Sequence, residues 1–535
     1  MEGKFKKKLT LLDLTFLGLG SIIGSGWLFA SMNGAQFAGS VAWLAWVGGA
    51  IAVLLIGLVY GELAAAIPRA GGFVRYPEYT HGSLVGYMTG FASLMAYSSV
   101  AGIEVEAVVS HASYYAPWLM GDKGPSLAGT IVEILLLLVF FLLNYWSVNV
   151  FGKVNTIVTA FKFIVPTCTI IALLMFFKGS NLSVGGAAPG GAEGVFTAIA
   201  GGGIVFAFLG FRQAVDFGAE AKNPQRDIPR AIIIAVFLGT AVYILLQLAF
   251  LGAVPADALG QGWGHIKDAM PKTANYPFVW VASSLGLTWL STLLLIDAVI
   301  SPAGTGNIYL SGTGRVLYAW SNNRHFYSFF SKVHPKTGVP RAALWLSFIL
   351  AIVWILPAQF DTWSKLVDAV TSATVMTYMV GPISMMSMRR TLPNMKRPFR
   401  LPGGQILAPL AFIAATCIIY WAGWNTNRFL IGLTLASLIL YFAFMDKSDE
   451  TRGRLGRDWR AGAWLVVYYL FILAMSYIGA YGPLKNPWIP GPYLDTIVVV
   501  IGAIILYFWG LNSALPEPSF ETDTAGEAPP EFVEA

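Results

Sequence analysis

Two glycine-rich segments have the residue types that let a ligand approach the backbone. The first runs from Gly20 to Gly26, and the second is Gly201–Gly203, followed by Phe206–Phe211. Glycine weakens a helix, so each segment can interrupt one. Amide groups at the start of a half-helix favour an anion, and carbonyls at the end of the other half favour a cation. Two such breaks could hold a zwitterion such as an α-amino acid, with tight packing of membrane helices as the alternative role.

Lys162 is an ionisable residue deep inside an apolar run. It lies about nine residues past the start of that run, which at 1.5 Å per residue is roughly 14 Å. The hydrocarbon core of a bilayer is about 30 Å thick, so Lys162 is expected near its middle. Because burial disfavours a charged amine, Lys162 could exchange a proton in the physiological pH range, and we predict a proton-coupling role for it. The alternative is a fixed ion pair with Glu104 or Asp297.

Arg212 is a second buried cation, placed directly after the second glycine-rich segment. Its planar guanidinium matches the geometry of a carboxylate, so it could recognise an acidic substrate side chain. The alternative is a structural ion pair with Asp216, four residues further on, or with Asp297. Glu104, Asp216 and Asp297 also lie in apolar surroundings, and any of them could join a proton path.

The elements that must position these residues are membrane helices. The chain has 535 residues, of which 56% are hydrophobic and only 12% are charged, whereas soluble domains average about 25% charged residues. Its apolar runs are longer and more uniform than the strands of a membrane barrel. About fourteen runs can cross a bilayer as helices: 14–36, 41–67, 84–110, 126–146, 153–177, 195–218, 231–254, 278–310, 341–359, 364–388, 405–424, 428–445, 462–480 and 494–512.

Charge predicts the orientation of these helices. Most of the 34 Lys and Arg residues fall in alternate loops, which places both termini in the cytoplasm. The net charge of +6 is therefore explained by basic cytoplasmic loops of a protein in the cell membrane, and no nucleic-acid partner is expected. The predicted parts are a basic N-terminus (1–13), two five-helix repeats (14–177 and 195–388), four peripheral helices (405–512) and an acidic, disordered cytoplasmic tail (513–535).

Enzyme and pump motifs are missing from the sequence. No Gly-x4-Gly-Lys-Ser/Thr phosphate loop occurs, so ATP is not an expected partner. The five histidines are scattered without metal-ligand spacing, and no Gly-x-Ser-x-Gly nucleophile elbow is present. We therefore expect no enzyme activity, no metal and no cofactor.

Several motifs resemble the amino acid–polyamine–organocation permeases. The similar segments are Gly24-Ser25-Gly26, Glu62–Pro68 with Ala70-Gly71-Gly72, Phe206–Phe211, Lys222–Arg230, Arg315–Ala319 and Val333–Pro340. The resemblance implies an all-α membrane protein with a LeuT-type core of two inverted five-helix repeats, whose first and sixth helices are discontinuous. It also implies secondary transport of an amino acid by alternating access.

The resemblance implies roles for individual residues as well. Gly24, Ser25 and Gly26 would hold the substrate carboxylate, and Lys162 would stand where relatives bind sodium. The carbonyls of Ile22, Phe206 and Leu209 would receive the amino group, with the Phe206 ring as a gate or, alternatively, as ordinary core packing.

The expected activity is proton-coupled symport of an acidic amino acid, either aspartate or glutamate. Neutral amino acid symport, amino acid exchange and a sensor without transport are the alternatives.

Overall fold

The structure is a computed structural model in which helices run along most of the chain. It describes residues 4–121, 124–146, 148–184, 186, 188–271, 276–355, 363–444, 449–520, 523 and 529–533. Within these ranges the only paired strands are β1 (Met120–Gly121) and β2 (Gly124–Pro125), which form a short antiparallel hairpin. The predicted all-α class is therefore confirmed.

The helices occur in three groups along the chain. The first contains α1 (Leu11–Ile22), α2 (Gly26–Ala38), α3 (Ala42–Ala66), α4 (Gly72–His81), α5 (Ser83–Ala112), α6 (Leu127–Trp146) and α7 (Val148–Leu174). The second contains α8 (Gly191–Gly201), α9 (Ile204–Phe208), α10 (Gln213–Asp216), α11 (Pro224–Ala253), α12 (Ile266–Ala269), α13 (Pro277–Ser284), α14 (Thr288–Asn322), α15 (Arg341–Ile355), α16 (Trp363–Tyr378) and α17 (Val380–Thr391). The third contains α18 (Gly404–Trp421), α19 (Gly423–Ala436), α20 (Leu438–Phe444), α21 (Asp449–Ile478) and α22 (Leu494–Ser513).

The number of membrane-spanning helices differs from the predicted fourteen. Among the described residues, 10 helices are long and apolar enough to cross a membrane, or 11 if the bent pair of α8 and the segment Ile204–Asp216 is one span. This count treats Gly26–Ala66, which contains both α2 and α3, as a single span. Helix α1 falls below the length that a crossing requires, and α15 is described only as far as Ile355. The count of fourteen is not confirmed, because helix breaks shorten several predicted runs.

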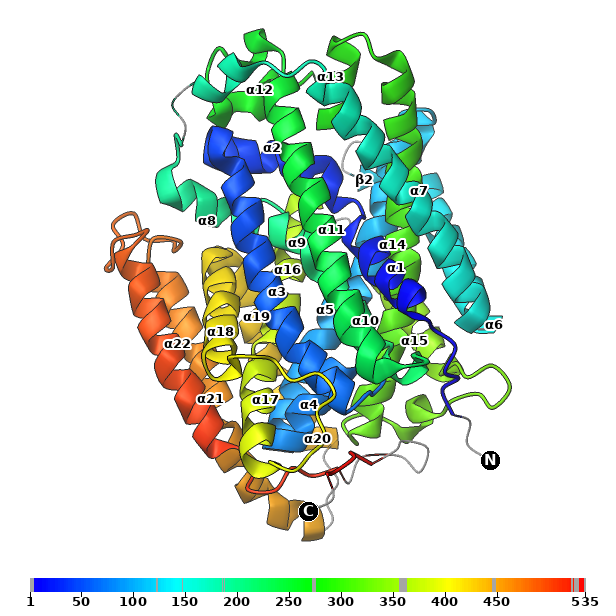
Figure 1. Ribbon diagram of the computed structural model, residues 1–535, viewed down its shortest axis with the longest axis vertical. Helices are drawn as coiled ribbons and strands as arrows, with labels where there is room; N and C mark the ends of the chain where they lie inside the picture. The colour runs from blue at the N-terminus through cyan, green and yellow to red at the C-terminus, as the bar shows by residue number, and fades with distance from the viewer. Residues whose placement is uncertain are drawn as a thin grey trace.

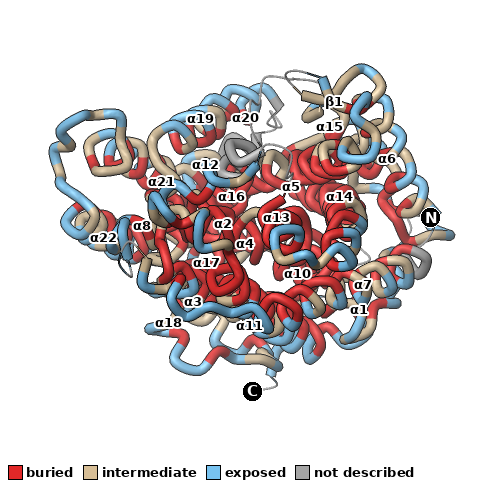
Figure 2. Tube along the Cα trace, turned by 90° about the horizontal axis from the view of Figure 1, so that it is seen from above, coloured by how far each residue is buried: buried red, intermediate tan, exposed pale blue. Residues whose placement is uncertain are grey.

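Long helices pack in pairs around a buried centre. The two most extensive helix contacts join α5 to α14 and α3 to α11. Figure 1 shows α21 and α22 at one edge of the molecule, beside α18, and Figure 2 shows that the buried residues concentrate in the helices of the interior. This arrangement places α1, α9 and α10 inside the bundle, where the glycine-rich segments lie.

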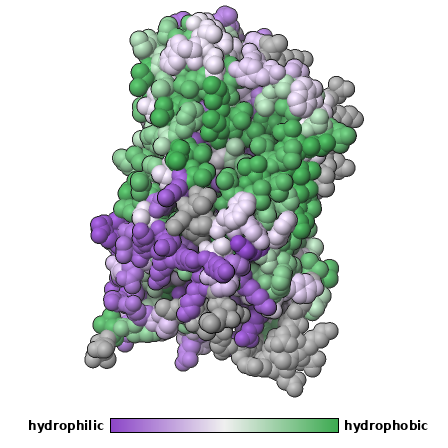
Figure 3. Space-filling view, turned by 90° about the vertical axis from the view of Figure 1, so that its right-hand side faces the viewer, coloured by the Kyte–Doolittle hydropathy of each residue, from purple (hydrophilic) through white to green (hydrophobic). Residues whose placement is uncertain are grey.

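The outer surface is suited to a bilayer. Figure 3 shows one face of the molecule, on which a broad hydrophobic region lies above a gathering of hydrophilic residues. Large apolar side chains such as Ile157, Phe237 and Ile505 are exposed on long helices. Lipid can cover such a surface, whereas water would not.

Both chain termini lie at the same end of the molecule (Figure 1). We call this end the terminal face; it consists of residues 4–10, 67–81, 217–223 and 393–397 and the described residues after Ser513. A parallel bridge joins Leu9 to Ala221, and an antiparallel bridge joins Ala70 to Phe217. The sequence predicted a disordered tail from residue 513, but the described residues of this segment make hydrogen bonds and ion pairs with the terminal face.

Candidate functional site

The first helix break follows from the glycine-rich sequence between α1 and α2. Helix α1 begins with a capping box, in which Thr10 and Asp13 each accept a hydrogen bond from the other's backbone. It ends at Ile22, after which Ile23 leaves the helical region with φ −85° and ψ 82°. Helix α2 starts at Gly26, so residues 23–25 are the predicted interruption.

The second break lies between α8 and α9. Gly203 adopts φ +83°, a left-handed conformation that favours glycine over residues with a side chain. The helix axis bends by 46° here, and α9 continues through a 3₁₀ turn (Leu209–Arg212) into α10. The Gly201–Gly203 segment therefore interrupts this helix as predicted.

The two broken helices touch each other in the centre of the bundle. A Cβ atom on Gly210 would collide with the backbone of Ser21 and Ile22. A Cβ atom on Gly26 would lie 3.1 Å from the Phe206 ring. Glycine is required at these positions because two backbones, or a backbone and a ring, come into direct contact.

The backbone at the start of α2 already binds a carboxylate. The Ser25 amide donates to Oε2 of Glu104, on α5, at 3.2 Å, and both residues are fully buried. The other carboxylate oxygen of Glu104 lies close to Gly24, since a Cβ there would be 3.0 Å from it. The Ser25 amide, which was predicted to bind the substrate carboxylate, therefore binds a side chain of the protein in this structure.

The carbonyls predicted to receive an amino group also have partners. The Tyr243 hydroxyl donates to the carbonyl of Ile22 at 2.6 Å, and the Tyr378 hydroxyl donates to that of Leu209 at 3.2 Å. The carbonyl of Phe206 accepts from the backbone amide of Leu209. The Ile22 carbonyl also accepts from the backbone amide of Gly24 at 3.1 Å, so a substrate amino group would have to displace one of its donors.

Lys162 connects the end of α1 to two other helices. Its Nζ donates to the Gly20 carbonyl at 2.5 Å and to Thr305 Oγ1 at 2.8 Å, while Thr305 donates to the same carbonyl at 2.9 Å. The ammonium is fully buried. Among the described residues, its hydrogen bonds go to a carbonyl and a hydroxyl and no direct ion pair with Glu104 or Asp297 is formed, although the charges of both carboxylates act on it.

Arg212 has a closed set of partners on α5, α10 and α16. Its Nε donates to Asp216 at 2.8 Å, and its two terminal nitrogens donate to Thr377 at 2.7 Å and Ser93 at 3.1 Å. The guanidinium carbon also lies 4.3 Å from the centre of the Tyr97 ring. The structure therefore contains the Arg212–Asp216 ion pair, which was the alternative to substrate recognition by Arg212.

Asp297 lies on α14, away from this arginine pair. Its Oδ1 accepts from the hydroxyl of Ser301 at 2.8 Å, and the side chain is fully buried. The candidate residues therefore fall into two groups: Ser25, Glu104 and Lys162 around the α1 break, and Arg212 with Asp216 at the end of the second broken helix.

Sequence reasoning missed Thr305, Tyr243 and Tyr378, which occupy the carbonyls at the breaks. Tyrosine is common in membrane helices, so no signal singled out the two tyrosines. Thr305 stands between Gly304 and Gly306 in the sequence, and that spacing could have marked a point where α14 approaches another backbone.

The paired breaks and the apolar bundle define a membrane protein that offers backbone groups to a ligand in its core. The sequence profile described as amino acid permease matches residues 9–511. The chain belongs to this family, as its motifs indicated.

Named relatives match over most of their length. The aspartate–proton symporter of Bacillus subtilis (strain 168) is 42% identical over 528 residues, covering 98% of this chain and 99% of the relative. The glutamate/serine transporter AimA of the same organism is 39% identical over 521 residues, covering 95% and 94%. The human b(0,+)-type amino acid transporter 1 is 24% identical over 463 residues, covering 82% and 88%.

Proposed function

We propose that this protein is a secondary active transporter that moves an acidic amino acid, aspartate or glutamate, together with a proton. The observation that carries the proposal is the contact between two broken helices in the buried core, with Lys162 bonded to the end of one of them. Two relatives, described as an aspartate–proton symporter and a glutamate/serine transporter, support the substrate class.

The proposed architecture is a LeuT-type core of two inverted five-helix repeats with four peripheral helices. Its support is the pairing of corresponding helices. The second helix of the first repeat, α3, packs along α11, its counterpart in the second repeat, and α5 packs along α14 in the same way. The two broken helices also contact each other. A twofold axis between the repeats would produce all three pairings.

In the proposed topology, the terminal face lies in the cytoplasm and the hydrophobic region lies in the cell membrane. The lysines and arginines of the alternate loops support this orientation. Alternating access would then open the central site to one side of the membrane and afterwards to the other.

The substrate carboxylate would bind at the start of α2, to the backbone amides of Gly24, Ser25 and Gly26. Glu104 now occupies the Ser25 amide, so substrate and Glu104 would compete for one donor. The amino group would lie at the carbonyls of Ile22, Phe206 and Leu209, with the Phe206 ring as a cover. Phe206 is 8% exposed, while Ile22 and Leu209 are each 1% exposed.

Lys162 would couple the proton to the movement of α1. When protonated, its ammonium holds the Gly20 carbonyl and Thr305 together, which fastens the end of α1 to α14. A neutral amine is a weaker donor, so loss of the proton would loosen this junction. Proton release and helix movement would then be linked at one contact.

Recognition of the acidic side chain by Arg212 stays a prediction. The ion pair with Asp216 already satisfies the guanidinium charge. We therefore favour a structural role for Arg212 within the proposed transporter.

Uptake by the purified protein in liposomes tests the proposal. Labelled aspartate, glutamate and leucine are offered with and without an inward proton gradient. We expect aspartate or glutamate to accumulate only when the gradient is present.

Each other outcome selects an alternative. Accumulation of leucine alone would indicate a neutral amino acid carrier. Uptake that is equal without the gradient would indicate exchange, and binding without uptake would indicate a sensor.

A further inference from the structure

The C-terminal segment after α22 caps the end of α4. The last carbonyls of a helix have no partners within it. In α4, the carbonyl of Thr80 accepts from the amide of Leu515 at 2.8 Å, and that of Tyr79 accepts from the amide of Ser519 at 2.9 Å. The Phe520 ring lies 4.9 Å from the Tyr79 ring. The segment therefore satisfies backbone groups that α4 itself cannot.

Further along the same segment, the carboxylate of Asp523 enters a site with three donors. Its oxygens lie 2.5 Å from a terminal nitrogen of Arg69, 2.5 Å from one of Arg75 and 2.5 Å from the Tyr79 hydroxyl. The Arg75 and Arg69 side chains are 0% and 3% exposed, and that of Asp523 is 12% exposed. Charge-assisted hydrogen bonds of this kind are about twice as strong as neutral ones, so this contact is more than a surface ion pair.

The two arginines flank a turn that is wedged between other helices. The Gly71 amide donates to the carbonyl of Asp216, at the end of α10, at 3.0 Å. Gly71 has φ +63°, and a Cβ there would lie 2.6 Å from both Ala319 Cβ and the Arg315 carbonyl, on α14. Residues 70–72 therefore fill the space between the second broken helix and α14.

Other contacts close the terminal face around this turn. Arg315 pairs with Glu220 at 2.8 Å, and the carbonyl of Glu220 accepts from the amides of Lys8 and Leu9, just before α1, at 2.9 Å. Both broken helices are thus joined to α14 through one ring of contacts, and the turn that Arg69 and Arg75 flank belongs to that ring.

We propose that the segment from Ala514 to Asp523, of which residues 514–520 and 523 are described, is a latch that holds the terminal face closed. Its binding site is the carboxylate pocket of Arg69, Arg75 and Tyr79, and its occupant is the chain's own Asp523. Release of Asp523 frees the turn between α3 and α4, so that α10 and α14 can separate. This regulation goes beyond the transport proposed above.

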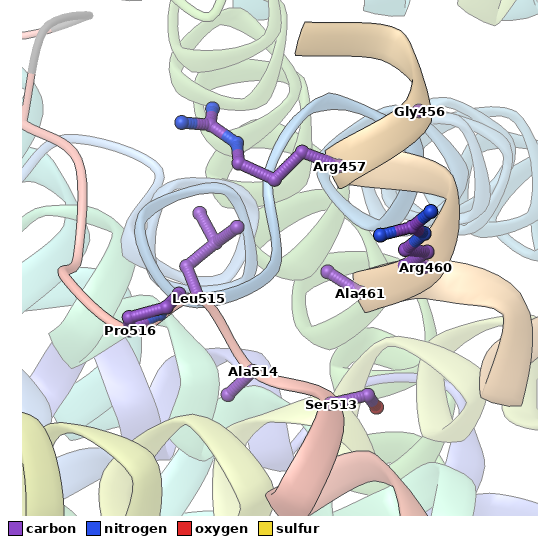
Figure 4. Close-up of a pocket in the computed structure, with 8 residues that line it drawn as sticks. All are labelled: Gly456, Arg457, Arg460, Ala461, Ser513, Ala514, Leu515 and Pro516. Atoms are coloured by element: carbon purple, nitrogen blue, oxygen red, sulfur yellow. The ribbon is translucent and has the colours of Figure 1, made fainter.

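The latch begins directly after α22, which packs along α21 and α18. Asp458, on α21, accepts from the Ser83 amide at 3.0 Å and from its hydroxyl at 2.7 Å, at the junction of α4 and α5. Residues 513–516, where the latch begins, line a pocket of about 370 Å³ together with Arg457 and Arg460 (Figure 4).

Hydrogen exchange on the full-length protein in lipid nanodiscs tests the latch. Asp523→Asn removes the charge and keeps the side-chain shape. We expect exchange across residues 67–81 to become about tenfold faster, because two charge-assisted bonds are weakened.

A second carboxylate of the tail provides the matched control. Glu531 pairs with Lys396 at 2.9 Å, with side chains that are 60% and 54% exposed. Glu531→Gln should leave the exchange of residues 67–81 unchanged. Equal exchange in the wild type and Asp523→Asn, or an equal acceleration in Glu531→Gln, would overturn the proposal.

A mutant cycle and transport give a second readout. Arg69→Gln and the double variant with Asp523→Asn should accelerate exchange no more than Asp523→Asn alone, and additive effects would contradict the latch. In liposomes, Asp523→Asn should raise the initial uptake rate several-fold, and an unchanged or lower rate would contradict the latch.

The two proposals can fail separately. If the wild type transports nothing, the proposed function is wrong, and hydrogen exchange still tests the latch.

Discussion

Lys162 and Arg212 are both buried cations next to a broken helix, but their surroundings differ. Arg212 has a carboxylate partner at 2.8 Å and two hydroxyl acceptors. Lys162 has only a carbonyl and a hydroxyl, with no carboxylate within 4 Å among the described residues. A buried cation with a counter-ion is held in its charged form, whereas one with neutral partners can lose its proton. The difference supports our proposal that Arg212 is structural and that Lys162 takes part in coupling, although the charges of Glu104 and Asp297 also act on Lys162.

The largest expected effect comes from removing the counter-ion of Arg212. Asp216→Asn leaves a buried guanidinium without a negative partner, so we expect a loss of about 3–5 kcal/mol in unfolding free energy. Thermal and denaturant unfolding in detergent measure it. The double variant Arg212→Met with Asp216→Leu should recover most of the loss, because it removes both charges.

The exposed Asp257 supplies the control for this experiment, since Asp257→Asn should change nothing. If Asp216→Asn were as stable as the wild type, Arg212 would have another counter-charge. Retained aspartate selectivity in the double variant would exclude Arg212 as the substrate's partner.

The next effect concerns Lys162 and should alter transport without altering stability. In Lys162→Met the Gly20 carbonyl keeps its bond from Thr305, so we expect stability within about 1 kcal/mol of the wild type. Uptake driven by a proton gradient should be lost. Lys162→Arg should also lose it, because arginine does not release a proton in proteins.

Both Lys162 variants are compared in liposomes with and without the gradient, beside their unfolding curves. If Lys162→Arg still concentrated the substrate, the coupling proton would reside elsewhere, for example on Glu104 or Asp297.

A smaller effect is expected from the carboxylate at the Ser25 amide. Glu104→Gln replaces a charged acceptor with a neutral one, which competes less well with a substrate carboxylate. We expect the apparent KM for aspartate to fall up to about tenfold, measured from initial uptake rates. The control is Glu133→Gln, another buried glutamate, on α6. A raised KM would instead show that Glu104 helps to bind the substrate.

The smallest effect is the pH response of Asp523, an ion pair outside the membrane-spanning helices. Burial alone would raise its pKa, but the hydrogen bonds and charges of Arg69 and Arg75 outweigh burial and hold the pKa below its usual range. A carboxyl with a lowered pKa stabilises the structure above its ordinary pKa and loses this contribution only as pH falls through the lowered value.

The latch should therefore be independent of pH between about 5 and 8, since both limits lie above the ordinary pKa of aspartate. The measurement is the ratio of exchange in residues 67–81 between Asp523→Asn and the wild type. A ratio that falls to one at pH 5 would contradict this pKa.

Much of the architecture followed from local sequence features. Long apolar runs predicted membrane helices, and glycine clusters predicted the interruptions at residues 23–25 and 202–203. A glycine break is a property of a few residues, and a membrane span is a property of about 20 consecutive ones, so both can be read from a continuous stretch of sequence. The number of spans did not follow, because the break after Ile22 separates α1 from α2 and the bend at Gly203 divides another predicted run.

Contacts between residues far apart in the chain could not be predicted from local sequence features. Nothing in the sequence distinguished the neutral partners of Lys162 from a carboxylate such as Glu104, although Arg212 and Asp216 at i and i+4 could be paired in advance. The tail resembled a disordered segment because acidic and proline-rich chains rarely bury themselves. Asp523 is ordered by Arg69 and Arg75, more than 440 residues earlier in the chain.

The sequence by itself determined a membrane bundle with two flexible points in its helices and two cations in its core. Those properties come from hydrophobicity and from glycine, and each depends on residues that are close together in the sequence. Only the tertiary structure decided that the breaks touch, which cation has a counter-ion and where the tail binds. These outcomes depend on charges and backbones meeting across hundreds of residues, because electrostatic and packing energies act through space and not along the chain.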